Sequence, residues 1–170
     1  MSNRVSGSIS FMSRTVSSIR LKILYTESMS LVEETSHYFD KEGGTLSKTL
    51  PRAVSGLYVS ESVLLTTRLM QMVSWLLMQR ALENGEMSLE QVIMEKKKIQ
   101  FDSSDVGGFS AEWNEMPCFF RNLVERSLQL QKRIILLDKE IYDPYFQYSS
   151  HKPNHVQTQI QLLESCFGNV

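Results

Sequence analysis

The sequence has few residues that break helices or form covalent links. It contains 8 glycines and 4 prolines in 170 residues, and only 2 cysteines. An all-β domain needs many tight turns, so this scarcity favours long helices. Cys118 and Cys166 lie far apart and form no CxxC pair, so the chain has no disulfide framework. We therefore expect a reducing, cytoplasmic environment.

Charge of one sign and long apolar runs are also lacking. The formal net charge is −1, so no basic field is available to hold nucleic acid. The most apolar stretch, from Leu69 to Gln79, is flanked by Arg68 and Arg80. It is much shorter than the roughly 20 residues that a membrane-spanning helix needs. We therefore expect neither nucleic acid nor a membrane as a partner.

Short catalytic motifs are missing as well. The chain has no GxSxG, no glycine-rich phosphate loop, no HExxH and no paired Glu-x-x-His. A hydrolase triad, a nucleotide site, a zinc protease and a di-iron bundle thus lack their signatures. His151 and His155 are four residues apart, but Pro153 lies between them and Cys166 is the only other soft ligand nearby. Zinc sites use at least three protein ligands, so we expect no metal, no cofactor and no catalytic residue.

What the sequence does contain is helical periodicity, which begins at about residue 19 and continues to about residue 40. Residues three, four and seven apart share one face of a helix. Here the face carries apolar residues spaced by seven with small residues between them: Leu24, Ser28, Leu31, Thr35 and Tyr38. Gly43 and Gly44 are expected to end this helix.

A second helix is predicted from Pro51 to about Glu83, where Asn84 and Gly85 follow. Its apolar stripe consists of Val54, Tyr58, Leu65, Leu69, Met72 and Leu76. Further apolar residues widen this stripe past half of the circumference: Leu64, Val73, Trp75, Leu77 and Leu82. A helix of this kind must contact more than one neighbour.

A short helix and a third long helix complete the pattern. Ser88 and Gln91 fit a capping box that begins a helix at residues 89–98. The region 101–115 has loop composition, and its aromatic residues should pin it to the bundle: Phe101, Phe109 and Trp113. The third long helix runs from near Pro117 to about Tyr142. Its main stripe is Phe119, Leu123, Leu130, Ile134, Leu137 and Ile141.

These elements predict an all-α fold, an antiparallel three-helix bundle with a short extra helix between the second and third long helices. We expect a flexible tail at residues 1–17, the bundle at 18–143 and a second tail at 144–170 with a short helix. The apolar second helix and a second line on the third helix predict a homodimer. That line is also the expected dimer or partner surface: Val124, Leu128 and Ile135.

Two polar or tail features have alternative interpretations. Glu61 and Arg68 are seven residues apart at one edge of the second stripe. They either form a register pair, which fixes the alignment of two helices or two subunits, or lie at the boundary of the stripe with their charged groups in water, as we favour.

The C-terminal tail either docks onto a partner or packs on its own bundle. Its apolar face consists of Val156, Ile160, Leu163 and Phe167.

Several long blocks of the chain resemble one family. They are LPRAVSGLYVSESVLLTTRLMQMVSWLLMQRALENGEMS from Leu50, LYTESMSLVEETSHYFD from Leu24, MEKKKI from Met94 and LVERSLQLQKRI from Leu123. Together they resemble the DUF1465 family of alphaproteobacterial proteins, the family of regulators of CtrA degradation, over about residues 20–142. The resemblance implies a three-helix bundle that forms a homodimer. It also implies a non-enzymatic adaptor that helps the ClpXP protease degrade a cell-cycle regulator such as CtrA.

Two hypotheses for function follow. The first is this adaptor, which needs no cofactor because it works by tethering. The alternative is a small-molecule or metal-binding helical bundle with enzymatic activity. Ligands that project inward from facing helices would mark that alternative, and the stripes here are almost entirely aliphatic.

Overall fold

The structure is a computed structural model that describes residues 5–99, 101 and 111–143, with side chains from Ser17 onward except at 46–48. The chain divides into two compact units, residues 1–134 and 135–170. The boundary falls inside the last long helix, so the bundle is described below for the first unit.

The described residues form helices and contain no strand, which confirms the all-α prediction. The elements are α1 Val5–Tyr38, the π-helical turn η1 Phe39–Gly43, α2 Gly44–Thr49, α3 Arg52–Glu83, α4 Leu89–Lys96, α5 Ala111–Asn114 and α6 Cys118–Tyr142.

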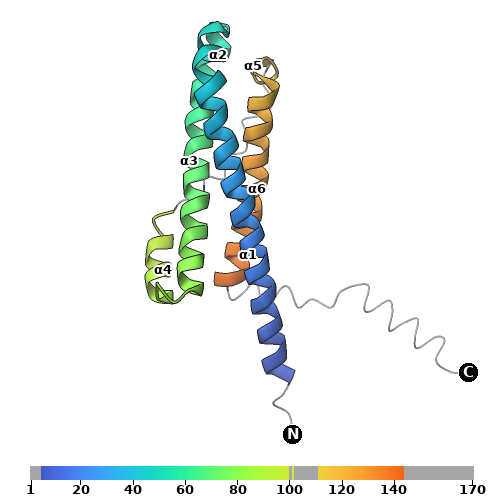
Figure 1. The fold of residues 1–170 in the computed structure, drawn as a ribbon, viewed down its shortest axis with the longest axis vertical. Coiled ribbons are helices and arrows are strands. Elements are labelled where there is room, and N and C mark those ends of the chain that lie inside the picture. The colour runs from blue at the N-terminus through green and yellow to red at the C-terminus, as the bar shows by residue number, and fades with distance from the viewer. Residues whose placement is uncertain (1–4, 100, 102–110, 144–170) are drawn as a thin grey trace, which may run out of the picture. The chain divides into compact units, whose positions relative to one another are not determined.

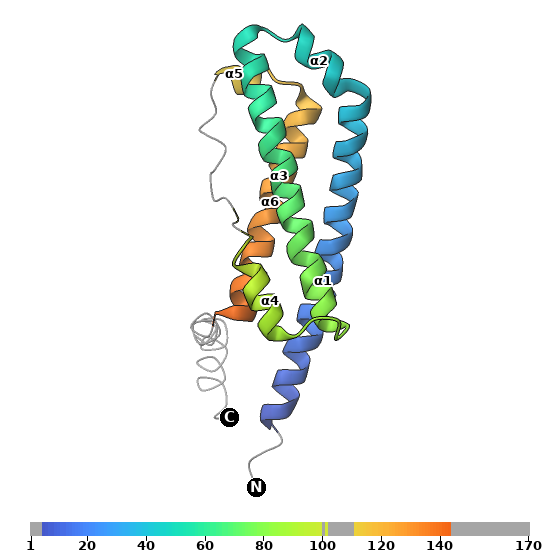
Figure 2. The ribbon, with the colours of Figure 1, turned by 90° about the vertical axis from the view of Figure 1, so that its left-hand side faces the viewer.

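Within residues 1–134, α1, α3 and α6 as far as Ile134 lie side by side (Figures 1 and 2). The helix α3 runs antiparallel to α1, and α6 runs parallel to α3. The short α4 packs against α3 after the hairpin that follows Glu83, and α5 packs against α3 near its beginning. The three-helix bundle with its extra short helix was predicted, and α1 is antiparallel to both of its long neighbours. The parallel direction of α3 and α6 differs from an antiparallel arrangement of all three helices.

The buried residues of each long helix are mostly three or four positions apart in sequence, as in bundles whose side chains interlock. On α1 the buried residues are Leu21, Leu24, Ser28, Leu31, Thr35 and Tyr38. On α3 they include Val54, Tyr58, Leu65, Leu69, Met72, Trp75 and Leu76. On α6 they are Phe120, Leu123, Val124, Ser127, Leu130, Gln131, Ile134 and Leu137.

Specific contacts hold the helices of the first unit in register. The Tyr58 hydroxyl donates to the Tyr38 hydroxyl at 3.3 Å, between α3 and α1. The Arg126 guanidinium of α6 makes two hydrogen bonds to the Glu34 carboxylate of α1, at 2.5 and 3.0 Å. A second pair, between Arg133 and Glu27, lies two helical turns further along both helices. These repeated pairs align α1 and α6 along their length.

The ends of α3 and α4 follow the sequence signals. Pro51 is the residue before the first turn of α3, and Gly85 after its end has a positive φ of 74°. The Ser88 side chain accepts from the Gln91 backbone N–H, and the Gln91 side chain accepts from the Ser88 N–H. This capping box was predicted. Trp113 on α5 is buried, which confirms its role as a pin, whereas Phe109 lies outside the described residues.

The first helix begins at Val5 rather than near residue 19, which corrects its predicted start. The flexible tail at residues 1–17 stays a prediction. Apolar periodicity detects the buried part of a helix, not its full length. Once a helix is nucleated, each further residue extends it at little cost, and serine is only a moderately poor helix former. The segment 5–17 can therefore be helical without an apolar stripe that faces the core.

Gly43 and Gly44 do not end the helix, which is a second correction. Gly44 has ordinary right-handed helical angles, and the helical path continues through η1 into α2. Gly43 serves a close approach instead. A Cβ atom at this position would lie 2.8 Å from Cδ1 of Phe39 and 3.2 Å from the Tyr58 hydroxyl oxygen. The absence of a side chain at Gly43 therefore lets η1 pack against α3.

A third correction concerns the start of α6. Phe119 was predicted in the core stripe, but it is half-exposed, and its neighbour Phe120 is fully buried. The Phe120 ring lies 4.5 Å from the Tyr58 ring and 6.0 Å from the Tyr38 ring, centroid to centroid. Phe120 lies seven residues before Ser127 and thus on the buried face.

Candidate functional site

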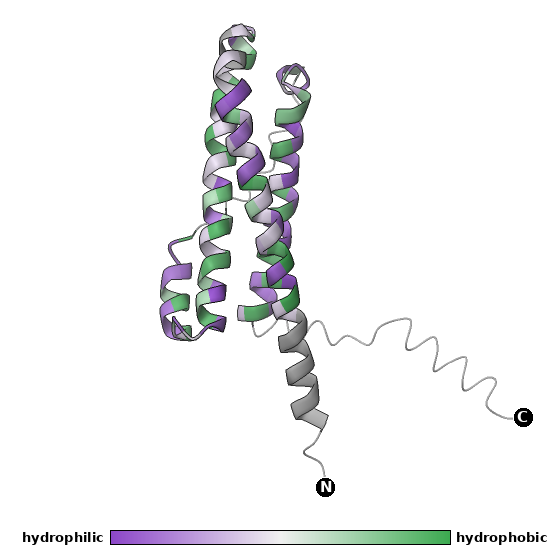
Figure 3. Ribbon diagram, viewed as in Figure 1, coloured by the Kyte–Doolittle hydropathy of each residue, from purple (hydrophilic) through white to green (hydrophobic). Residues whose placement is uncertain are grey.

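The helix α3 has an unusual distribution of charge. Between Arg52 and Arg80 its only charged residues are Glu61 and Arg68. Both are buried, with 8% and 7% of their surface exposed. The exposed side of α3 over this length therefore carries no formal charge. Figure 3 shows the same contrast, since hydrophilic purple is much rarer on α3 than on α1.

The two buried charges lie on the side of α3 that packs within the bundle. Arg68 Nη1 donates to Ser127 Oγ at 2.8 Å, and Ser127 Oγ donates to the Val124 carbonyl at 2.7 Å. Burial raises the pKa of Glu61, and the nearby charge of Arg68 partly opposes that rise. The interpretation that we favoured from sequence, in which both charged groups reach water, was therefore wrong. The register interpretation stays a prediction.

Two small residues of α1, Ser28 and Thr35, are buried like Glu61 and Arg68 of α3. Counted along the two antiparallel helices from the Tyr38–Tyr58 contact, Thr35 is at about the level of Glu61 and Ser28 at about the level of Arg68. The core therefore contains polar residues on both helices.

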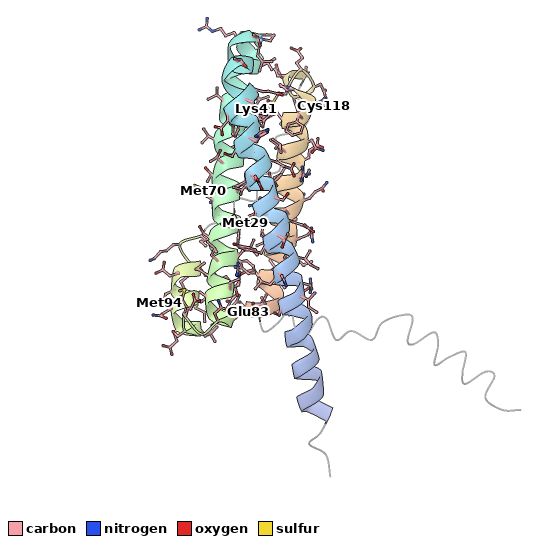
Figure 4. All side chains as sticks on the ribbon, in the orientation of Figure 1. Met29, Lys41, Met70, Glu83, Met94 and Cys118 are labelled. Carbon is pink, nitrogen blue, oxygen red and sulfur yellow. The ribbon has the colours of Figure 1, made fainter. Side chains whose placement is uncertain are left out.

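The opposite side of α3 is apolar and open. Val59, Val63, Met70 and Leu77 are 53%, 61%, 69% and 48% exposed. Figure 4 shows Met70 on the side of α3 that faces away from α1. A shallow hollow of about 390 Å³ lies between η1 and α3, and its lining is Phe39, Ser62, Val63, Thr66 and Thr67. We call this exposed, uncharged side of residues 56–81 the outer face of α3.

The other predicted site residues are distributed differently from the expectation. Val124 is fully buried within its own chain, so it cannot belong to a partner surface, and this part of the prediction is corrected. Leu128 and Ile135 are partly exposed. The predicted docking face of the tail lies outside the described residues, and so do His151, His155 and Cys166.

Among the residues described, no three of His, Cys, Asp and Glu come together in a way that could hold a metal ion. Within that part, no helix is both long and apolar enough to cross a membrane. The outer face of α3 is thus the most distinctive surface of the described structure.

Comparison with known proteins identifies the family. The family model described as "Protein of unknown function (DUF1465)" matches residues 12–167. This chain belongs to the DUF1465 family. The crystal structure of RcdA from Caulobacter crescentus CB15 is similar to it, with 38% sequence identity and a TM-score of 0.59. The match covers 72% of this chain and 90% of that chain. A search of curated proteins finds no match.

Membership of the DUF1465 family confirms the resemblance seen in the sequence blocks, and the similarity to RcdA supports the bundle. The outer face of α3, in contrast, was not recognised as a unit from sequence. Two features of the sequence nevertheless indicate this face. Residues 53–79 contain only two charges, and both of these lie at positions that continue the core stripe.

Proposed function

We propose that this chain is a non-enzymatic regulator of proteolysis, an adaptor that helps ClpXP degrade a cell-cycle transcriptional regulator resembling CtrA. The observation that carries the proposal is the 38% identity to RcdA over 90% of that protein's chain. This identity lies within one family whose model matches residues 12–167 here. The proposal places the protein in the cytoplasm, where ClpXP acts.

The physical basis of such a function is tethering. A bundle with a well-packed core holds its surfaces at fixed positions, and a partner bound to one surface is brought near a partner bound to another. The second encounter then becomes intramolecular, and its rate depends on an effective concentration rather than on catalysis. The aliphatic core and the paired helices α1 and α6 supply this rigidity.

A reconstituted degradation assay tests the proposal. Purified ClpXP and a CtrA-like regulator are incubated with and without this protein, and loss of the regulator is followed on gels. We expect faster degradation when the protein is present. The control is a substrate that ClpXP degrades unaided, whose rate should not change. Equal rates of regulator loss with and without the protein, at concentrations above those in the cell, would contradict the proposal.

We further propose that the C-terminal tail docks onto a partner through Val156, Ile160, Leu163 and Phe167. Deletion of residues 146–170 should then reduce stimulated degradation and leave the melting temperature of the bundle unchanged. A melting temperature that falls by many degrees would show instead that the tail is part of the folded structure. Unchanged stability with unchanged degradation would remove the tail from the mechanism.

We also propose that the protein works as a homodimer, so that each assembly offers two copies of every docking surface. Light scattering over a range of protein concentrations tests this directly. A mass of two chains is expected at tens of micromolar. A single-chain mass of 19.6 kDa at all concentrations would contradict the dimer.

A further inference from the structure

The first half of α1 carries an apolar stripe that the core of the bundle does not use. Its positions are four and three residues apart in turn, which is the spacing of one face of a helix. They are Val5, Ile9, Met12, Val16, Ile19 and Ile23. Residues 5–23 are all helical, so these six positions share one face over about 27 Å. We call them the N-terminal stripe.

The N-terminal stripe and the core stripe lie on different faces of α1. Leu21 and Leu24 begin the core stripe, and each is 4% exposed. Ile19 and Ile23 belong to the N-terminal stripe and are 56% and 47% exposed. Adjacent residues point about 100° apart on a helix. The same part of α1 therefore presents one apolar face to the core and another to solvent.

This half of α1 also extends past the other helices of the first unit. In Figures 1 and 2 the blue start of α1 continues beyond the end of α3 and beyond α4. In the described part of residues 1–134, no other helix lies beside this projecting segment. An amphipathic helix is stabilised mainly by burying its apolar face. The N-terminal stripe therefore needs an apolar medium that the bundle does not supply.

The charge of the segment indicates which medium this is. Residues 1–26 contain four basic side chains and no acidic one, which gives a formal charge of +4, whereas the whole chain has −1. The basic residues are Arg4, Arg14, Arg20 and Lys22, and most other polar residues there are serines. An apolar stripe alone would suit a protein helix equally well. Positive charge without any negative charge favours an anionic lipid surface, where such helices lie at the boundary between headgroups and acyl chains.

We propose that residues 5–23 of α1 bind the surface of an anionic phospholipid membrane through the N-terminal stripe. The sequence argument against a membrane partner considered only a helix that spans the bilayer. A helix that lies on the surface needs one apolar face and basic residues, not a long apolar run. Six apolar residues of moderate size bury little area, so the binding is reversible and depends on the charge of the lipid. This inference goes beyond the adaptor function and does not rest on it.

Vesicle flotation tests the binding. The full-length protein is mixed with phosphatidylcholine vesicles, or with vesicles of equal parts phosphatidylcholine and phosphatidylglycerol, and floated through a density gradient. We expect the anionic vesicles to bind at least about tenfold more tightly, and high salt to release the protein. If the unmodified protein does not float with the anionic vesicles, the proposal is wrong. Equal binding to both kinds of vesicle would overturn the recognition of anionic lipid.

A charge placed in the stripe tests the surface. Ile19→Glu should weaken binding to the anionic vesicles by about tenfold or more, because a carboxylate then lies on the face that enters the bilayer. Ile93→Glu is the matched control, since it makes the same change at an exposed isoleucine of α4 outside the stripe. It should bind like the unmodified protein. Circular dichroism verifies that both variants keep their helices, and equal binding by the two variants would overturn the stripe.

A polarity-sensitive dye tests the orientation of the helix. In a background with Cys118→Ser and Cys166→Ser, the dye is attached to Met12→Cys in the stripe or to Ser10→Cys. These positions are two residues apart, which places them on nearly opposite sides of a helix. Anionic vesicles should shift the emission of the dye at position 12 to shorter wavelength and leave that at position 10 unchanged. Equal shifts at both positions would overturn the proposed orientation.

The degradation assay separates this inference from the adaptor function. It contains no vesicles, so Ile19→Glu should stimulate degradation as well as the unmodified protein does. If Ile19→Glu loses this stimulation and the unmodified protein does not float with anionic vesicles, the stripe binds a protein and the membrane proposal is overturned. If the unmodified protein floats but does not stimulate degradation, the adaptor function is wrong and the membrane site stands.

Discussion

The two sides of α3 reverse the usual distribution of charge on a surface helix. Such a helix normally places apolar residues toward the core and charged residues toward water. Here the inner side contains the only two charges between Arg52 and Arg80, both buried, and the outer side contains none. Polar layers inside a bundle restrict which registers its helices can adopt. An uncharged exterior, in contrast, leaves a surface that water solvates less favourably than a charged one.

The largest difference between the two sides of α3 is expected in the free energy of unfolding when one large residue on each side is replaced by alanine. Trp75 on the inner side is fully buried, and Leu77 on the outer side is half-exposed. Trp75→Ala should lower the free energy of unfolding by about 3–5 kcal/mol, because it opens a large cavity. Leu77→Ala should change it by less than about 0.5 kcal/mol. Urea unfolding followed by circular dichroism measures both.

Both truncated variants and the unmodified protein are compared at the same protein concentration. Equal losses from the two truncations would contradict the division of α3 into a packed side and an open side.

A smaller effect is expected where η1 reaches the inner side of α3. Gly43→Ala places a methyl group against Phe39 and the Tyr58 hydroxyl, and overpacking of this kind costs about 1–3 kcal/mol. The adjacent Gly44→Ala is the control. It has helical angles and no atom within 4 Å of an added Cβ, so it should be neutral or stabilising by up to about 1 kcal/mol. In thermal melts, Gly43→Ala should lower the melting temperature, and Gly44→Ala should leave it unchanged or raise it.

The smallest effects are expected in the pH dependence of stability. Here the buried Glu61 and the partly exposed Glu34 should differ in sign. Burial raises the pKa of Glu61, so the folded state takes up a proton there more readily than the unfolded state. Its contribution to stability therefore falls as the pH rises through the raised pKa. Glu61→Gln should remove this loss, giving equal or greater stability at pH 7 and a weaker dependence on pH in the mildly acidic range.

Glu34 should behave in the opposite sense. Hydrogen bonding to Arg126 lowers its pKa, so its stabilising contribution is present above the ordinary carboxyl pKa and is lost as the pH falls. The pair is partly exposed, and Glu34→Gln should cost at most about 1 kcal/mol at pH 7. Urea midpoints between pH 4 and 8 should converge with those of the unmodified protein at acidic pH. Divergence at acidic pH would contradict this sign.

The sequence predicted α3 well because a long run with few charges and a proline at its start leaves little choice of structure. It predicted the buried polar residues poorly, because Glu61 and Arg68 were expected to reach water and Ser127 and Gln131 were left out of the core stripe of α6. Phe119 and Phe120 show the consequence. Adjacent residues point about 100° apart on a helix, and aliphatic residues alone could not decide between them. Ser127 and Gln131, counted as core, would have placed Phe120 inside.

The N-terminal extension of α1 and the role of Gly43 were beyond sequence analysis for different reasons. Residues 5–17 are rich in serine and do not continue the core stripe of α1, so the periodicity of the core could not indicate a helix there. The glycine at 43 depends on the position of Tyr58, which is distant in sequence and known only once η1 and α3 are packed together.

The burial of both tryptophans has a practical consequence for experiments on this protein. Trp75 and Trp113 are the only two in the chain, and their exposed surfaces are 0% and 2%. Neither belongs to the outer face of α3. Their fluorescence should therefore shift to longer wavelength when the bundle unfolds and stay constant when two folded chains associate or separate. The molecule thus contains an intrinsic optical reporter of the folding of its core.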